Sequence, residues 1–512
     1  MPSPASPDIH GSSSWLVPGS RELRMILIGL LLTVLLAALD QTIVATALPT
    51  IVGDLNGLEH ISWVITAYMI SSTITLPIYG KLGDLYGRKT LFLFSAVVFL
   101  VGSVLCGVAG SMWQLILFRA VQGIGGGGIF TGATAILADV LAPRDRGRYM
   151  GLIGAAFGIA SVAGPLLGGF LTDALSWRWV FYVNLPLGAL ALFFILKFLH
   201  LGTPKHATPP RIDYLGIILM VIGSSSLILV SSWGGTVYPW GSPQIMALIA
   251  LAVVSVALFI AVELRVKEPL IPLGILKDPN VWVCVFMGVG VSAAMMSVGA
   301  YLPTFFQMVW GVSATVAGLM ILPMTFAQVA ATIISGRLIS ATGNYKLYLV
   351  AGPALIIPGL FGFSLIDQHT SYLWLSVLMV VICVGIGFTL QNTLLVVQNS
   401  VPPRDIGAGT STTTFIRQLG ASLGIAVSGS LFIGNLTAFT QQHSAQMTAQ
   451  SLNAQQLSSL TPQVLASLPE TAQQLIAEAF STAMPPIFLF SIPAVLLSFV
   501  LSFFIRQVPL QK

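Results

Sequence analysis

Two ionisable residues fall inside long apolar stretches of this sequence, where a charge is energetically costly. Asp40 follows the run VLLAAL, and Arg119 lies within LILFRAVQG. In hydrocarbon a carboxylate must be paired, hydrated or protonated, because burial disfavours its charged form. Asp40 is therefore a candidate for binding and releasing a proton, and a permanent structural ion pair is the alternative. Both residues are expected about 9 to 12 Å from the outer ends of their helices, so we predict that they interact.

A second set of charges lies in the short segment GKLGDLYGRKT, residues 80–90. Asp84 and Arg88 are four residues apart and can pair. Asp139, at the end of a later apolar run, is placed to contact Arg88. Three glycines permit a tight reversal of the chain between two helices: Gly80, Gly83 and Gly87. A purely structural loop is the alternative interpretation.

The sequence contains little that suggests catalysis. Cys106, Cys284 and Cys383 all fall inside apolar stretches, so neither disulfides nor a metal site are indicated. The glycine run 125–128 lacks the lysine of a phosphate-binding loop, and no nucleophilic triad is apparent. We therefore expect no enzymatic activity and no cofactor, with energy drawn from a proton gradient.

The elements that hold these residues are apolar helices. The chain is 55% hydrophobic and only 8% charged, which is too apolar for a surface that faces water. Runs of about 20 apolar residues are long enough to cross a bilayer as helices. We count fourteen, approximately at 25–48, 61–79, 90–110, 113–138, 149–171, 178–199, 212–232, 244–264, 281–305, 314–339, 347–366, 372–396, 407–434 and 484–505. The predicted fold is an all-α polytopic membrane protein.

The distribution of basic residues predicts the orientation. Of the 22 Lys and Arg, 19 fall in the tails and in alternate loops, beginning with Arg21 and Arg24. Lysine and arginine in short loops are retained on the cytoplasmic side of the membrane. We therefore expect a multi-pass protein of the cell (inner) membrane with both termini in the cytoplasm. The net charge of +5 reflects this topology, and nothing indicates nucleic-acid binding.

Two landmarks recur at nearly one spacing, which indicates an internal duplication. GKLGDLYGRKT is followed 256 positions later by GRLISATGNYK, and PRDRG at 143–147 reappears as PRDIG at 403–407. Such duplication is typical of transporters whose halves move about a central site. The predicted organisation is a disordered cytoplasmic tail (1–24), a six-helix bundle (25–200), two linker helices (201–280), a second six-helix bundle (281–505) with a long extracytoplasmic loop (434–485), and a cytoplasmic tail (506–512). Part of that loop, around VLASLPETAQQLIAEAF, is a candidate surface helix.

Six regions, in order along the chain, resemble the major facilitator superfamily and, within it, the fourteen-helix drug:proton antiporters. They are LDQTIVATALPTIVGDL, GKLGDLYGRKT, LILFRAVQGIGGGG, GIASVAGPLLGGFL with SWRWVFYVNLPLG, YLPTFFQMVWGVSATVAGLMILP, and FIRQLGASLGIAV. Together they span most of the sequence.

This resemblance implies roles for several of the residues above. Arg119 would take part in proton transfer by modulating a nearby carboxylate, and the Asp84 loop would latch against the other bundle and gate the inward transition. The copied loop has no acidic residue, so we expect a weaker gate, or none, on that side. The glycine-proline element GPLLGG marks antiporters in this family and is a candidate hinge, because proline weakens the helical ladder; its residues are Gly164, Pro165, Gly168 and Gly169.

A substrate cavity is expected between the two bundles. Its candidate residues are polar or aromatic groups at membrane depth: Gln122, Tyr301, Phe305, Phe306, Gln307, Gln391, Asn392, Arg417 and Gln418. Core packing or contact with lipid is the alternative for the aromatic residues. Arg417 suits a substrate carboxylate, which leaves anionic substrates open, while the lack of an acidic residue in segments nine to fourteen argues against dications.

The predicted function is export of hydrophobic or amphipathic small molecules in exchange for protons by alternating access. A proton-coupled transporter of one metabolite, such as a siderophore, fatty acid or amino acid, is the main alternative. A membrane receptor or scaffold on a transporter fold is a third. The expected partners are the substrate, protons and the lipid bilayer, and the sequence leaves a periplasmic adaptor open.

Overall fold

The structure, a computed structural model, describes residues 16–55, 60–201, 212–235, 237–266, 268–444, 465 and 468–508. These residues are almost entirely helical, and an isolated β-bridge joins Gly234 to Tyr238. The first half contains α1 (Arg21–Leu55), α2 (Ile61–Tyr86), α3 (Arg88–Gly107), α4 (Met112–Val140), α5 (Pro143–Ala174), α6 (Trp179–Tyr182) and α7 (Asn184–Phe198). The remainder contains α8 (Tyr214–Trp233), α9 (Pro243–Glu263), α10 (Pro279–Val309), α11 (Ala314–Met320), α12 (Leu322–Thr342), α13 (Lys346–Phe363), α14 (Tyr372–Ser400), α15 (Ile406–Gln442), α19 (Glu470–Ala483) and α20 (Pro485–Ser502).

These helices confirm the predicted polytopic fold. Thirteen helical segments of the described chain are long and apolar enough to cross a membrane, with α6–α7, α11–α12 and α19–α20 each forming one segment. Helix α2, at 26 residues, supplies the fourteenth by its length. Helix α1 is longer than predicted because Pro49 lies inside it and does not end it. Asp40 is therefore about 22 Å from the outer end of α1, deeper than expected.

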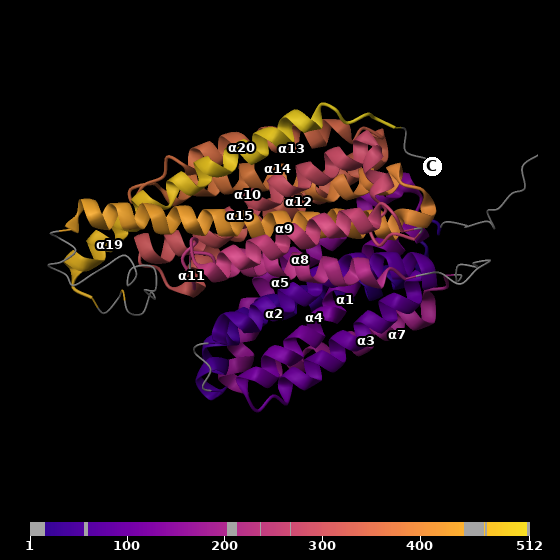
Figure 1. The fold of residues 1–512 in the computed structure, drawn as a ribbon, viewed down its shortest axis with the longest axis horizontal. Coiled ribbons are helices and arrows are strands. Elements are labelled where there is room, and N and C mark those ends of the chain that lie inside the picture. The colour runs from indigo at the N-terminus through magenta and orange to yellow at the C-terminus, as the bar shows by residue number, and fades with distance from the viewer. Residues whose placement is uncertain are drawn as a thin grey trace, which may run out of the picture.

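The helices form two bundles that converge at one end (Figure 1). Helices α1 to α7 pack with one another, and α10 to α15 pack with α20. At the converging end, α2 contacts α15 and α5 contacts α12. The ends of the described chain lie at this same end, since the Leu16 N–H donates to the Val140 carbonyl and the Tyr345 hydroxyl donates to the Arg506 carbonyl. We refer to it as the inner end.

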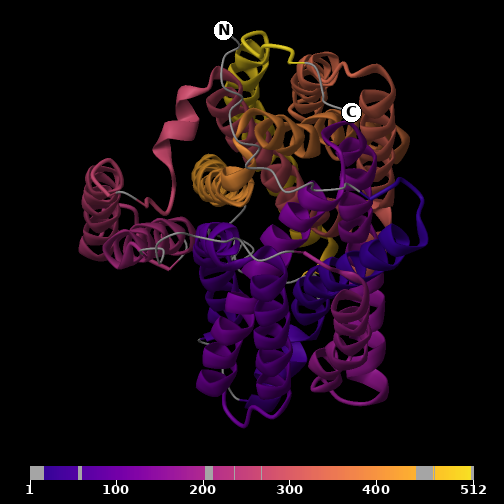
Figure 2. The same cartoon turned by 90° about the vertical axis from the view of Figure 1, so that its right-hand side faces the viewer.

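The two linker helices lie beside the bundles and do not complete either one (Figure 2). Helices α8 and α9 pack on each other, and α8 also contacts α2 and α15. The short 3-10 helix Leu273–Lys277 follows them and leads into α10. At the inner end of α9, the buried Glu263 carboxylate accepts backbone N–H groups of Leu270 and Ile271, which fastens the returning chain.

The glycine run of α4 allows three helices to approach closely. A Cβ atom at Gly125 would lie 2.3 Å from the Phe99 backbone nitrogen on α3, and one at Gly127 would lie 2.3 Å from the Ser72 carbonyl oxygen on α2. Such distances leave no room for a methyl group. The run is therefore a packing surface, and its close packing positions Arg119 and Gln122 one to two turns away.

The region predicted as a loop, 434–485, is helical at both ends. Helix α15 continues to Gln442, and α19 covers Glu470–Ala483 before α20 begins. Helix α19 buries one apolar face against α15 and α10, and the Phe480 ring lies 5.4 Å from that of Phe432. Burial of this face stabilises the helical conformation of α19, which precedes the apolar run predicted to cross the membrane. The candidate surface helix is thus confirmed from Glu470 onward, and most of the region before it, residues 445–464, lies outside the described chain.

Replacing Gly125 by alanine is expected to lower the thermal stability of the purified protein. The added methyl group would contact the backbone of α3, and overpacking of this kind costs about 1–3 kcal/mol. Gly299→Ala on α10 is the matched control, because nothing lies within 4 Å of its added Cβ. That change should leave the melting temperature unchanged or raise it, since alanine favours helix. Equal melting temperatures for the two variants would contradict the packing role of the α4 glycines.

Candidate functional site

A buried ion pair joins α1 to α4 in the first bundle. The Arg119 Nη1 atom lies 2.5 Å from Asp40 Oδ2, and both residues are almost completely inaccessible. The structure thus brings together the two residues that the sequence indicated. Charges in such surroundings are tolerated only when their remaining hydrogen-bonding groups also find partners.

Two amides and a hydroxyl supply those partners. Gln122 Nε2 and Asn184 Nδ2 both donate to Asp40 Oδ1, at 2.7 Å and 3.0 Å. The same two nitrogens also donate to the Ser103 hydroxyl, at 3.2 Å and 2.9 Å. Gln122 in turn accepts from Arg119 Nη1 at 2.7 Å. The Asp40 network, as we name these five residues, therefore draws on α1, α3, α4 and α7.

Aromatic rings complete the enclosure of the arginine. The guanidinium carbon lies 4.3 Å from the centre of the Tyr68 ring and 6.0 Å from that of Phe181. Its Nε also donates to the Val64 carbonyl at 3.4 Å. A cation above an aromatic face is stabilised by the ring quadrupole. Arg119 is held by a charge, an amide, a backbone carbonyl and a ring, which leaves it little freedom while Asp40 stays ionised.

The sequence did not single out Ser103 and Asn184. Both are uncharged residues within apolar runs, and both are completely buried. The feature that could have identified them is a polar side chain, an amide or a hydroxyl, at membrane depth. Hydropathy alone does not distinguish such residues from those that only pack in the core. The Asn184 Oδ1 atom is buried without a hydrogen-bond partner. It is therefore an unsatisfied acceptor on a side chain whose Nδ2 atom contacts the carboxylate.

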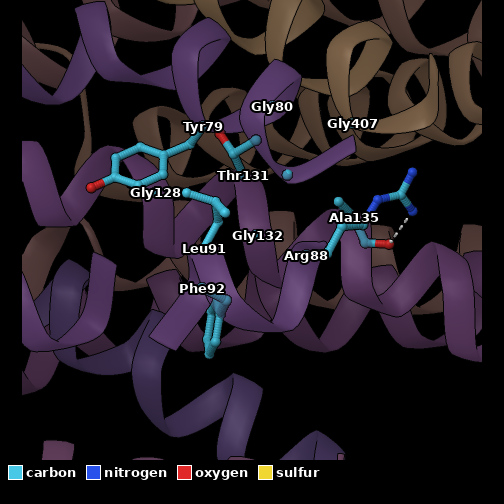
Figure 3. Close-up of a pocket in the computed structure, with 11 residues that line it drawn as sticks. Tyr79, Gly80, Arg88, Leu91, Phe92, Gly128, Thr131, Gly132, Ala135 and Gly407 are labelled. Carbon is cyan, nitrogen blue, oxygen red and sulfur yellow. Dashed lines mark hydrogen bonds between the residues drawn. The ribbon is translucent and has the colours of Figure 1, made fainter. Parts of the chain in front are cut away.

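The charges of GKLGDLYGRKT form a second cluster at the inner end. Arg88 donates to Asp84 Oδ1 from Nη2 at 2.7 Å and also pairs with Asp139, as predicted. A further bond from Arg88 reaches the Ala135 carbonyl on α4 at 3.2 Å (Figure 3). Arg88 is thereby fixed between α2 and α4.

Asp84 also reaches across to the second bundle. Its two carboxylate oxygens accept the backbone N–H groups of Gly407 and Ala408, at 3.1 Å and 2.8 Å. These groups belong to the first turn of α15, whose N–H groups have no partner within the helix. Asp84 therefore caps α15 and interacts with the positive end of its dipole. Gly80 lies against Gly407 and Ser411, where a Cβ would be 2.1 Å from the Ser411 hydroxyl, so α2 and α15 meet tightly.

A second contact between the halves was not expected from the sequence. Arg144, at the start of α5, donates to the Ser340 and Ala341 carbonyls at the end of α12, both at 2.7 Å. A contact is therefore present on this side although GRLISATGNYK has no acidic residue, and the expectation that a gate here is weaker stays a prediction. The helix C-terminus itself supplies the acceptors, and a cation there is favourable.

The glycine-proline element packs α5 on α1. A Cβ at Gly164 would lie 1.9 Å from Thr42 Oγ1, and one at Gly168 would lie 2.9 Å from the Ile43 carbonyl oxygen, while Gly169 faces open space. Helix α5 runs unbroken past Pro165. The Thr42 hydroxyl donates to the Ala160 carbonyl at 3.0 Å, just before the proline. The element places α5 beside the helix that carries Asp40, and its role as a hinge stays a prediction.

The candidate cavity residues separate into two groups. Phe305 and Phe306 are completely buried in the apolar core of the second bundle, where the Phe306 ring stacks on Trp310 at 5.2 Å. Their placement on a cavity wall is wrong, because helical spacing does not distinguish a core face from a cavity face. Asn392 is also buried and donates to Ser335 on α12. Gln122 belongs to the Asp40 network.

The other candidates are partly exposed. Tyr301 lies 5.7 Å from the Phe432 ring, and Gln307 donates to the Pro303 carbonyl of its own helix. Gln391 on α14, and Arg417 and Gln418 on α15, lie within their helices with partial exposure. Within the described residues, no group of three His, Cys, Asp or Glu side chains is arranged to hold a metal ion.

Known proteins share this fold and sequence. The family profile of the Major Facilitator Superfamily matches residues 30–425. An uncharacterized MFS-type transporter of Mycobacterium tuberculosis H37Rv is 39% identical over 99% of this chain and 73% of its own length. Multidrug transporter protein MdtP of Bacillus subtilis is 36% identical over 92% of this chain and 88% of its own. A bacterial homolog of the human lysosomal transporter Spinster, solved in an inward-facing and occupied conformation, superposes with a TM-score of 0.57 at 16% identity, covering 95% of this chain and 97% of that one.

Asp84→Asn is expected to loosen the inner end of the molecule. The change removes the charge that pairs with Arg88 and interacts with the α15 dipole, interactions that together contribute about 1–3 kcal/mol. Spin labels at the exposed positions Tyr86 and Arg404 would report the separation of the bundles by double electron–electron resonance. A longer-distance population should appear in the variant. Glu22→Gln, which removes an exposed carboxylate at the same end, is the control; an unchanged distribution for Asp84→Asn would exclude a gating contact.

Proposed function

This chain belongs to the Major Facilitator Superfamily, and from that premise we propose that it exports hydrophobic or amphipathic compounds from the cell in exchange for protons. The family makes it a membrane transporter of small molecules. Export of drug-like compounds is supported by its relative MdtP, which is named as a multidrug transporter. The observation that carries proton coupling is the buried Asp40 network.

Asp40 is the proposed proton carrier. Among the residues within hydrogen-bonding distance, Arg119 and the Gln122 and Asn184 amides all donate to its ionised form. A proton on Asp40 would remove the charge that attracts Arg119 and would turn one acceptor oxygen into a donor. If the Asn184 amide turns over, its unsatisfied Oδ1 atom would accept a hydrogen bond from the protonated carboxyl. Protonation therefore rearranges contacts between four helices, which is the link that coupling requires.

The inner-end contacts support alternating access. Asp84 and Arg144 hold the two halves together through the ends of α15 and α12. Release of both contacts would let the bundles separate at this end, which the distribution of basic residues assigns to the cytoplasm. We propose that the two six-helix bundles move in this way, with α8 and α9 as linker helices and GPLLGG as the bending point of α5.

A proton gradient is an adequate source of energy. One charge moving through 100 mV releases about 2.3 kcal/mol, and each unit of pH difference adds about 1.36 kcal/mol. One proton per cycle therefore supports roughly tenfold or greater accumulation of substrate outside the cell.

Replacing the Asp40 carboxylate should abolish proton-driven export, and the variant can keep its fold if Arg119 is replaced as well. Asp40→Asn alone leaves Arg119 buried without a counter-charge, which costs about 3–5 kcal/mol. The double variant Asp40→Asn, Arg119→Gln removes both charges, so it is expected to be the more stable of the two. In proteoliposomes with an imposed pH gradient it should bind substrate but show no coupled proton flux.

Asp173→Asn is the matched control, because Asp173 is an exposed carboxylate on α5. It should transport protons and substrate like the wild type. Full substrate-dependent proton flux by the double variant would contradict the assignment of Asp40 as the proton carrier.

A further inference from the structure

Arg417 is a membrane-depth cation in the second bundle, where three helices meet. It lies on α15, its Nη1 donates to the Leu390 carbonyl on α14 at 3.2 Å, and a Cβ at Gly288 on α10 would lie 3.6 Å from its Cδ. The side chain is partly exposed. It is therefore held by neighbouring helices and keeps part of its surface accessible.

No acidic side chain of the described chain pairs with Arg417. Between Asp278 and Glu470 the sequence contains only two acidic residues, Asp367 and Asp405. Asp367 lies between α13 and α14, and Asp405 precedes α15 by one residue, about 18 Å along the helix from Arg417. Arg119 differs in this respect, because a carboxylate oxygen of Asp40 lies 2.5 Å from its Nη1 atom.

The internal duplication does not supply the missing counter-charge. At the repeat spacing of 256–260 positions, Asp40 corresponds to residues 296–300 and Arg119 to residues 375–379. These stretches read MSVGA and LSVLM, and neither contains an ionisable residue. A buried carboxylate–guanidinium pair is thus found in the first bundle alone within the described chain. In the second bundle, Arg417 lies at this depth without a carboxylate partner.

The Arg417 guanidinium has N–H donors and a positive charge that lack protein partners in the described chain. It carries five N–H donors, of which the structure uses one for a protein acceptor. Its charge is costly at membrane depth unless water or an anion approaches it. The planar fork of donors matches the two oxygens of a carboxylate better than any neutral group.

A second unsatisfied polar atom lies nearby along α14. Gln391 follows Leu390 directly, and its Oε1 atom is buried without a hydrogen-bond partner. Its Nε2 points to α5 of the first half, where a Cβ at Gly154 would lie 3.9 Å away. This amide is thus at the boundary between the bundles, close to the carbonyl that Arg417 uses. The Leu390 side chain itself is apolar and buried.

We propose that Arg417 binds the negatively charged group of the substrate, and that the substrates of this protein include amphipathic organic carboxylates. Gln391 would accept a hydrogen bond from a hydroxyl or amide of the same molecule. This inference rests on the proposed export function and specifies its substrate class. It also separates two tasks in space: the first bundle carries the proton on Asp40, and the second bundle carries the substrate charge on Arg417.

Equilibrium binding to the purified full-length protein tests this assignment without a proton gradient. The probes are 1-pyrenebutyrate, neutral 1-pyrenebutanol and 1-pyrenebutylammonium, which share one apolar body and differ in charge. Saturable energy transfer from tryptophan to pyrene reports their binding. The wild type should bind the carboxylate at least about tenfold more tightly than the alcohol, and the ammonium most weakly, because a hydrogen-bonded charge pair contributes this much.

Arg417→Gln should lose that preference, with about a tenfold fall in carboxylate affinity and little change for the alcohol. Arg417→Lys should fall in between, because lysine keeps the charge but not the fork. Arg337→Gln removes an exposed cation from α12 and should bind like the wild type. The Arg417→Gln melting temperature should be unchanged or higher, since an uncompensated charge is removed.

Several results would overturn the proposal. One is a wild type that binds the three probes equally or does not bind the carboxylate. Another is an Arg417→Gln variant that keeps its carboxylate preference. A variant that loses stability with unchanged selectivity would assign Arg417 to holding α14 through the Leu390 carbonyl. Normal charge-selective binding with no proton-driven flux would instead count against the proposed export function and leave this site intact.

Discussion

The buried pair of Asp40 and Arg119 is the interaction on which the arrangement of the first bundle depends. A carboxylate and a guanidinium removed from water lose solvation, and their attraction offsets that loss only when every remaining polar group is satisfied. Five helices, α1 to α4 and α7, must therefore bring the ion pair, a serine, two amides, a backbone carbonyl and an aromatic ring to one point. The glycine run of α4 and the glycines of α5 make this approach possible, because larger residues would hold the helices apart. A proton on Asp40 would remove the charge that these contacts satisfy.

The inner end is closed by a different kind of contact. Asp84 interacts with the N-terminus of α15 and Arg144 with the C-terminus of α12, so each charge meets the complementary end of a helix dipole in the other half. Backbone groups at helix ends need partners in any conformation, and water can replace these side chains when the halves separate. Such contacts contribute modest free energies. They suit a transporter, in which the closed and open forms must differ by only a few kcal/mol.

The sequence predicted the charged part of this architecture and missed much of the polar part. Asp40 and Arg119 stand out because ionisable residues are rare at membrane depth, and Asp84 and Arg88 because they lie in a short charged motif between two apolar runs. Asn184 and Ser103 do not stand out, since neutral polar residues are common in apolar helices and only the fold shows that they face the carboxylate. The prediction that Phe305 and Phe306 line a cavity is wrong for a related reason. The spacing of residues along a helix shows which of them share a face, but it does not show what packs against that face. Arg144 was missed because its partners are carbonyl groups, which every residue has.

Proton coupling through this site requires Asp40 to change its ionisation state when the protein changes the side to which it opens. Infrared difference spectroscopy measures this directly, through the carboxylic acid band that disappears in the Asp40→Asn variant. Protein trapped by cross-links in its outward-open and inward-open forms should show Asp40 protonated in one form and ionised in the other at the same pH. A band of equal intensity in both forms, or absent from both, across the pH range of transport would contradict the account.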